Sequence, residues 1–225
     1  MQSLLWRSSR WLLALVLFLA CTGCSWALAE VLRRSQAADF WLALSGGALC
    51  WLIVFFSLPK PMWVYVVGHE LTHAIWAWLS GGRVRSLKAC AAGGHVVLSK
   101  TNTLIALSPY FFPLYAVLWA LLYTLGRLMV RGTDLTAWFH FGLGFSYAFH
   151  VTLTARILRI RQPDIAGEGR ILSVMVIWLG NVLVLLLGLP LLTRDLTVLG
   201  TVALALERTG QVIAAAGALG QRLIP

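Results

Sequence analysis

Charged residues are scarce in this chain of 225 residues: they make up 12% of it, whereas hydrophobic residues make up 60%. The mean hydropathy is +0.82, and several apolar runs approach or exceed the ~20 residues with which a helix crosses a bilayer. This balance excludes an ordinary soluble domain. The composition predicts an all-α, polytopic protein embedded in a lipid bilayer.

Acidic residues are the scarcest charged class, with 8 Asp and Glu against 18 Lys and Arg, for a net charge of +10. Such an excess in a soluble protein suggests nucleic acid. Here the basic residues lie mainly in short loops between apolar runs, where they set orientation and meet anionic headgroups. No basic stripe is interleaved with aromatic residues. We therefore expect no nucleic-acid partner.

Cysteines are few as well, at four. Cys21 and Cys24 form a C-x-x-C pattern, but the pattern lies inside the first apolar run. No second pair completes a zinc site, and no strand–helix context supports a redox motif. We interpret both residues as small apolar side chains of a helix.

The first thirty residues allow two interpretations. Basic residues precede the apolar run 11–20, and "ALAE" at 27–30 resembles the cleavage site of a signal peptide. Arg33 and Arg34 follow directly, and positive charges at that point oppose export. We therefore favour an uncleaved first helix.

The apolar runs predict about six to seven transmembrane helices, without internal repeats or low-complexity linkers. Their expected ranges are 9–31, 39–58, 62–80, 104–130, 135–160, 171–193 and 196–220, the last of which crosses the membrane or lies along its interface. We expect three segments: N-terminal helices at 1–58, a membrane core at 59–193 and a C-terminal helix at 194–225.

The segment 81–103 differs from the helices around it. Glycine pairs flank short alternating stretches, which predicts a small β-hairpin or re-entrant segment near 84–100. Non-helical backbone near membrane depth is tolerated only when it is buried in protein or lines a wet cavity. The positive-inside rule favours the loops 81–103 and 156–170 on the cytoplasmic side, if the N-terminus faces outward.

The stretch "HELTH" at 69–73 is an H-E-x-x-H motif inside an apolar, Trp-rich run. On a helix, His69 and His73 share one face, so both imidazoles can reach one metal ion. Glu70 is displaced by about 100° round the helix, where it can act on a water at the metal instead of on the metal. Zinc acidifies such a water and the glutamate takes its proton. The alternative, polar groups that only pack helices, is costly inside a membrane.

A catalytic zinc site has three protein ligands and an open position. The candidates for the third ligand are Asp164, His150, His140, His95, Asp134 and Glu168. Asp164 is favoured because "QPDIAGEG" follows the fifth helix on the same side as the end of the 62–80 helix. Asp164 reaches the same depth in the membrane as His69 if this segment is an unwound start of the sixth helix. His150 and Glu168 remain alternatives.

Four stretches together resemble a known family: "GHELTHA", then "GGRVRSL", the glycine-flanked "GGHVVLS" and "ALSPYFFPLYA" at the next helix. They resemble the site-2 proteases, membrane-embedded zinc metallopeptidases, and most closely the small bacterial branch without a PDZ domain. The resemblance covers about residues 62–185. It implies a three-helix catalytic core in a bacterial inner membrane. It also implies an aspartate ligand, which in the family usually lies in Leu-Asp-Gly; Asp164 in "QPDIAGEG" is the nearest match.

In that family the hairpin is thought to guide an extended substrate strand towards zinc. The resemblance implies that 93–100 does so here by β-addition. His95 then stabilises an oxyanion, or is an exposed histidine of the turn. Asn181 either binds the backbone of the substrate or forms a hydrogen bond to a neighbouring helix.

Two functions follow as hypotheses. The first is a zinc metalloendopeptidase that cuts membrane-anchored proteins. The second is a non-proteolytic scaffold or partner-binding protein with a structural zinc site. Glu70 discriminates between them because only hydrolysis needs it, and a fourth ligand such as His150 would favour the second.

Overall fold

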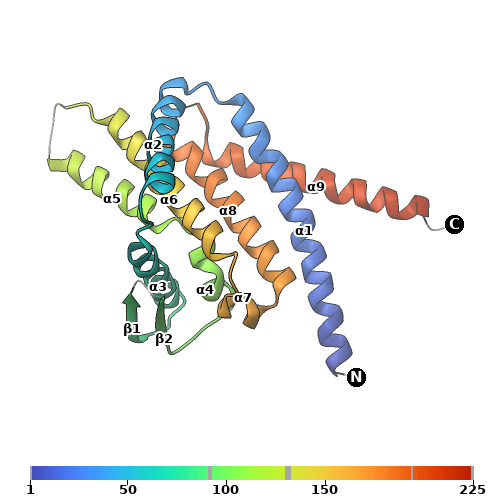
Figure 1. Ribbon diagram of the computed structural model, residues 1–225. Coiled ribbons are helices and arrows are strands. Elements are labelled where there is room, and N and C mark those ends of the chain that lie inside the picture. The colour runs from blue at the N-terminus through green and yellow to red at the C-terminus, as the bar shows by residue number, and fades with distance from the viewer. Residues whose placement is uncertain (1, 91–92, 130–132, 194, 224–225) are drawn as a thin grey trace. The chain divides into compact units, whose positions relative to one another are not determined.

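A computed structural model of the chain describes residues 2–90, 93–129, 133–193 and 195–223 (Figure 1). This part of the chain is mostly helical and carries one two-stranded antiparallel hairpin, as the sequence predicts. The chain divides into two compact units: the first is Met1–Ala37 with Glu168–Pro225, and the second is Ala38–Gly167. These units group the helices differently from the three segments expected from the sequence.

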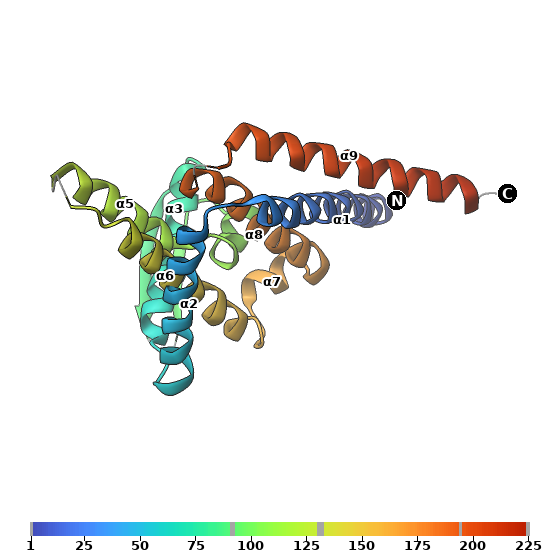
Figure 2. The ribbon, with the colours of Figure 1, turned by 90° about the horizontal axis from the view of Figure 1, so that it is seen from above.

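The first unit contains three long helices. They are α1 (Gln2–Arg34), α8 (Arg170–Leu192) and α9 (Val198–Leu223). Helix α1 packs against both of the others (Figure 2). An ion pair joins α1 to α9, with Arg208 Nε 2.8 Å from Glu30 Oε2, and Trp178 Nε1 of α8 donates to Ser25 Oγ of α1 at 3.0 Å.

The second unit contains the remaining elements. In chain order these are α2 (Ala38–Ser57), α3 (Met62–Leu79), β1 (Val84–Cys90), β2 (Gly93–Leu98), α4 (Thr103–Leu107), the 3-10 turn η1 (Ser108–Tyr110), α5 (Leu114–Met129) and α6 (Thr136–Ile157). Helix α7 (Pro163–Glu168) follows and belongs to this unit except for its last residue.

Four helices of the described residues are long and apolar enough to cross a membrane: α1, α2, α8 and α9. The bent pair of the α4–η1 stretch and α5 makes a fifth if it counts as one span. Helices α3 and α6 are not among them, and both carry histidines, which lower the hydropathy of an apolar run. The chain therefore has the helices of a membrane protein, while the count of six to seven spans stays a prediction.

The second unit is organised around the contact between α2 and α6. A methyl group on Gly47 would collide with the backbone oxygen of Phe141, and one on Gly144 with that of Leu44. Small residues at these crossings let the two backbones approach closely. Trp51 of α2 lies on the same interface and donates its indole N–H to Thr152 Oγ1 at 2.8 Å.

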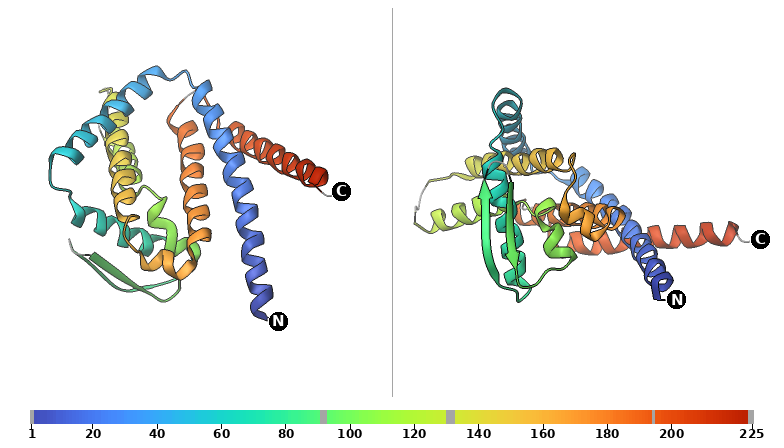
Figure 3. Two further views of the ribbon diagram at one scale, coloured as in Figure 1. Left: turned by 45° about the vertical axis from the view of Figure 1, so that its right-hand side comes forward. Right: turned by 60° about the horizontal axis from the view of Figure 1, so that its bottom comes forward.

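Helix α3 joins this pair through an aromatic cluster. Tyr65 of α3 packs with Trp51, Phe149 and Leu153, all of them buried, and its hydroxyl lies 3.1 Å from Thr154 Oγ1. The hairpin runs along the other side of α3 (Figure 3). The helix with the H-E-x-x-H motif is thus held between α6 and a β-hairpin.

The helix expected at 104–130 is interrupted, so the prediction of one continuous helix is wrong. Asn102 caps α4 by accepting from the Ile105 N–H at 2.8 Å. The chain then passes through η1 and bends by 77° before α5. Pro113 has no N–H to donate to a preceding carbonyl, so an α-helix cannot continue through it unbroken.

The unwound start expected for the sixth helix is also absent from the described residues, because the segment folds as the short helix α7. Pro163 occupies its first position, where the missing N–H is not needed. Gly169 then takes a φ of +91°, which separates α7 from α8.

Candidate metal centre

The two histidines of the motif lie one turn apart on α3 and face the same side. Their ring centroids are 4.9 Å apart, with the rings edge to face. Asp164 approaches both from α7: its Oδ2 lies 3.6 Å from His69 Nε2 and 3.6 Å from His73 Nε2. One donor atom from each of the three residues lies within 4.8 Å of the others. This group could therefore bind a metal ion.

Asp164 is the third member of the group, as the sequence favoured, although it arrives on a short helix. Among the residues that the structure describes, no other His, Cys, Asp or Glu joins this group. Glu168 falls in the first unit, and Asp134 accepts from the Thr136 N–H at 3.0 Å. The ring of His140 packs edge-on against that of Phe40, with the ring centroids 4.9 Å apart.

The break between α4 and α5 fixes the orientation of His73. Its Nδ1 lies 2.8 Å from the carbonyl oxygen of Ile105, which is fully buried. A carbonyl can only accept, so Nδ1 carries a proton, and in the neutral ring the lone pair is then at Nε2. A metal ligand needs this tautomer. Metal-binding histidines usually also have a hydrogen-bond partner at the other ring nitrogen, and the carbonyl of Ile105 is such a partner.

Tyr110, which the sequence did not single out, holds Asp164. Its hydroxyl donates to Asp164 Oδ2 at 2.8 Å, and its ring lies edge-on to His69 with centroids 5.2 Å apart. Only 1% of Tyr110 is exposed. A buried tyrosine usually has a hydrogen-bond partner for its hydroxyl. A tyrosine in the apolar stretch "SPYFF" is therefore the sequence feature that could have pointed to Tyr110.

The carboxyl of Asp164 is kept ionised by these neighbours. Burial raises its pKa, but the rings of His69 and His73 and the hydroxyl of Tyr110 outweigh burial and hold the pKa well below its usual range. A carboxylate and two imidazoles, which bind metals in their neutral form, are a donor set that suits a divalent cation.

Glu70 is buried, with 7% of the residue exposed, and lies beneath the hairpin. A Cβ on Gly94 would meet Glu70 Cγ at 2.8 Å and Glu70 Oε1 at 2.9 Å. Glycine at this position of β2 therefore lets the strand pass directly over the carboxylate. The glycine pair that predicted the turn also serves this close approach.

The two remaining predicted site residues belong to β2 and α8. His95 is exposed on β2 and pairs with Lys88 of β1. Asn181 belongs to α8 in the first unit, where its amide donates to the carbonyl oxygen of Ile177 at 2.9 Å. This bond is within one helix, so it supports neither suggested role, and binding of substrate by His95 or Asn181 stays a prediction.

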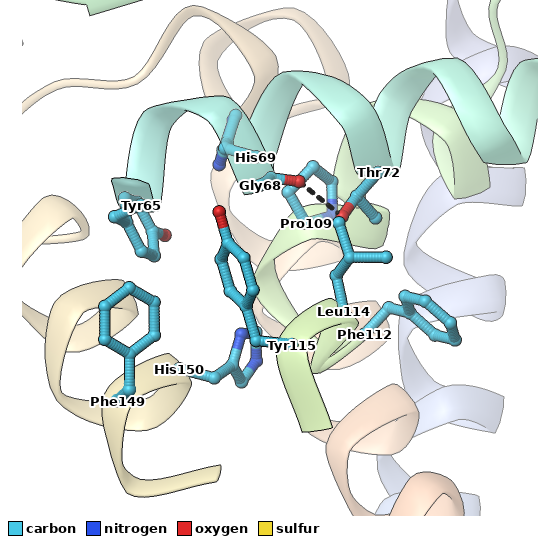
Figure 4. A pocket seen from close by; sticks show the side chains of 10 residues that line it. All are labelled: Tyr65, Gly68, His69, Thr72, Pro109, Phe112, Leu114, Tyr115, Phe149 and His150. Atoms are coloured by element: carbon cyan, nitrogen blue, oxygen red, sulfur yellow. Dashed lines mark hydrogen bonds between the residues drawn. The ribbon is translucent and has the colours of Figure 1, made fainter. Parts of the chain in front are cut away.

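A small cavity adjoins the metal group on the side of α6 (Figure 4). His69 and Gly68 of α3 and His150 of α6 form part of its wall. The remaining wall is mainly aromatic and includes Tyr65 and Tyr115. His150 thus lies beside a member of the metal group without belonging to it.

No protein-family model, curated protein or solved structure matches the chain.

Proposed function

We propose that the chain is a membrane-embedded zinc metalloendopeptidase of the site-2 protease type. One observation carries the proposal: His69, His73 and Asp164 converge on one point, and Glu70 lies one residue from the first of them. Two imidazoles and one carboxylate are the ligand set of a class of catalytic zinc sites that leave a fourth position open. A zinc ion held there supplies Lewis acidity to a peptide carbonyl and to water.

The side chains of the protein would divide the remaining work. Glu70 takes the proton from the attacking water and delivers it to the leaving amine. Glu70 is buried beneath Gly94 of β2, and this burial would shield the proton transfer from bulk water. Tyr110 and the carbonyl of Ile105 orient Asp164 and His73, so that the donor atoms do not have to reorganise for each turnover.

The hairpin suggests how the substrate is presented. In a two-stranded sheet each strand has one edge free of sheet pairing, and β2 crosses Glu70 at Gly94. An unwound, extended segment of a membrane-anchored protein could add to such an edge by main-chain hydrogen bonds. Cleavage then requires the helix of the substrate to unwind near the interface.

Removal of the metal tests this proposal. We expect purified wild-type protein to cleave a single-helix membrane protein in detergent, to lose this activity in a zinc chelator and to regain it when zinc is added back. The rate of product formation before and after zinc addition is the measurement. A cleavage rate unaffected by the chelator would contradict the proposal. Zinc binding without any cleavage would favour a non-proteolytic protein with a structural site.

Loss of the Tyr110 hydroxyl should loosen the metal site. Tyr110→Phe is expected to weaken zinc binding by about 10- to 100-fold, the usual effect of removing an outer partner of a metal ligand. Competition with a chromophoric chelator measures the zinc affinity. Tyr123→Phe is the matched control, since its hydroxyl lies 3.4 Å from Thr136 Oγ1, outside the metal group. Equal zinc affinities for the two variants would show that Tyr110 does not hold the ligand.

A further inference from the structure

The two histidines of the metal group differ in the hydrogen bonding of Nδ1, the ring nitrogen that is not the one close to Asp164. His73 donates through Nδ1 to the carbonyl oxygen of Ile105 at 2.8 Å. In the described part of the chain, His69 Nδ1 is fully buried and has no hydrogen-bond partner. A metal-binding histidine almost always donates its second N–H to an acceptor, and a buried donor without one is unfavourable.

A second imidazole with the same deficit lies nearby. His150 of α6 is buried, with 6% of the residue exposed. Its Nε2 is likewise buried without a partner among the described residues. His69 and His150 line the same cavity, as Figure 4 shows. Two histidines from different helices, each with a buried ring nitrogen that has no partner among the described residues, therefore line one small cavity.

The cavity has the size and polarity for a single water. Positions open to the centre of a water molecule fill about 10 Å³, which is close to the least volume that holds one ordered water. A buried water also needs two to four polar partners. The two ring nitrogens supply a donor and an acceptor. The Tyr115 hydroxyl, on the same wall, donates to the Val64 carbonyl oxygen at 2.5 Å and keeps its capacity to accept.

We propose that one buried water links His69 Nδ1 to His150 Nε2, and that His150 is a positioning residue for His69. The His69 N–H donates to the water, and the water donates to the lone pair of His150 Nε2. The ring of His69 is then held with its Nε2 towards Asp164, as the carbonyl of Ile105 holds His73. This inference rests on the proposed metal site, but it assigns His150 neither to the ligand set nor to catalysis.

The test compares zinc affinity among variants of two histidines on the same helix. His150→Leu removes the acceptor, and we expect it to weaken zinc binding by about 10- to 100-fold. His150→Gln restores an acceptor of similar reach and should recover most of that loss. His140→Leu and His140→Gln are the matched controls and should bind zinc as the wild type does, because His140 packs against Phe40 away from the metal group. Wild-type affinity in His150→Leu would overturn the inference.

A measurement on the wild type keeps the test decisive if His150→Leu does not fold. In zinc-loaded protein labelled with ¹⁵N-histidine, the Nδ1 proton of His69 should show a cross-relaxation peak to a bound water. Its absence would overturn the inference. Wild-type zinc binding that is lost in His69→Ala tests the metal site separately. If wild-type protein binds no zinc, the metal site and this inference both fail; if it binds zinc and His150→Leu does too, only this inference fails.

Discussion

Glu70→Gln is expected to reduce the rate of peptide cleavage by about 10²- to 10⁴-fold, the usual contribution of a positioned general base, while leaving zinc binding unchanged. The amide has the shape of the carboxylate, so it fits beneath Gly94 as Glu70 does. It cannot accept a proton at neutral pH. Glu70 is not a member of the group that could hold the metal, so the affinity for zinc should be retained. Initial cleavage rates and bound zinc, measured on the same samples, check both parts.

The control for this variant is Glu207→Gln, on the exposed surface of α9 in the first unit. It removes the same charge from the chain, and Glu207 is not a member of the metal group, so this variant should cleave at the wild-type rate. Cleavage by Glu70→Gln at the wild-type rate would rule out Glu70 as the base. Loss of zinc in Glu70→Gln would instead place Glu70 among the ligands.

Asp164→Ala is expected to weaken zinc binding by more than about 100-fold, beyond the 10- to 100-fold effect typical of an outer partner. The variant removes the only carboxylate that lies 3.6 Å from both histidine Nε2 atoms among the described residues. It also removes the carboxylate to which the Tyr110 hydroxyl donates, and only 1% of Tyr110 is exposed. Zinc affinity by chelator competition, with circular dichroism as a test of folding, is the measurement.

Glu168→Ala supplies the comparison, because Glu168 is the other acidic residue of α7 and an alternative third ligand from the sequence. We expect it to bind zinc as the wild type does. The reverse outcome, with zinc lost in Glu168→Ala and kept in Asp164→Ala, would assign the third ligand to Glu168.

The features that could be predicted from the sequence are those set by local pattern. Helix α3 was expected at 62–80 and spans Met62–Leu79, because an apolar run between Pro61 and Gly81 leaves little choice of ends. The hairpin followed from glycine pairs and alternation. The i, i+4 spacing alone brings His69 and His73 to one face of α3.

The features that were missed depend on contacts between distant segments. Tyr110 meets Asp164 across 54 positions, and Ile105 meets His73 across 32. No local periodicity records such pairs. Pro113 is the local sign of the bend before α5, whereas the apolar run around it is typical of one continuous helix. That bend places both partners at the metal group.

The short helix α7 shows a similar limit. The segment was expected to be unwound, whereas Pro163 begins a helix there and Gly169 follows its end. The prediction that Asp164 approaches the histidines nevertheless holds, since it required only that the chain return to α3 at this point. Local sequence therefore did not determine the conformation of this segment, although Asp164 lies beside both histidines as expected.

The most direct measurement is the anomalous scattering of zinc in crystals of the zinc-loaded protein. The proposed site predicts one strong peak per chain, within bonding distance of His69 Nε2, His73 Nε2 and Asp164 Oδ2, with a fourth side open towards Glu70. No peak at this position, or one bonded to a fourth protein side chain such as His150, would contradict the proposed catalytic centre.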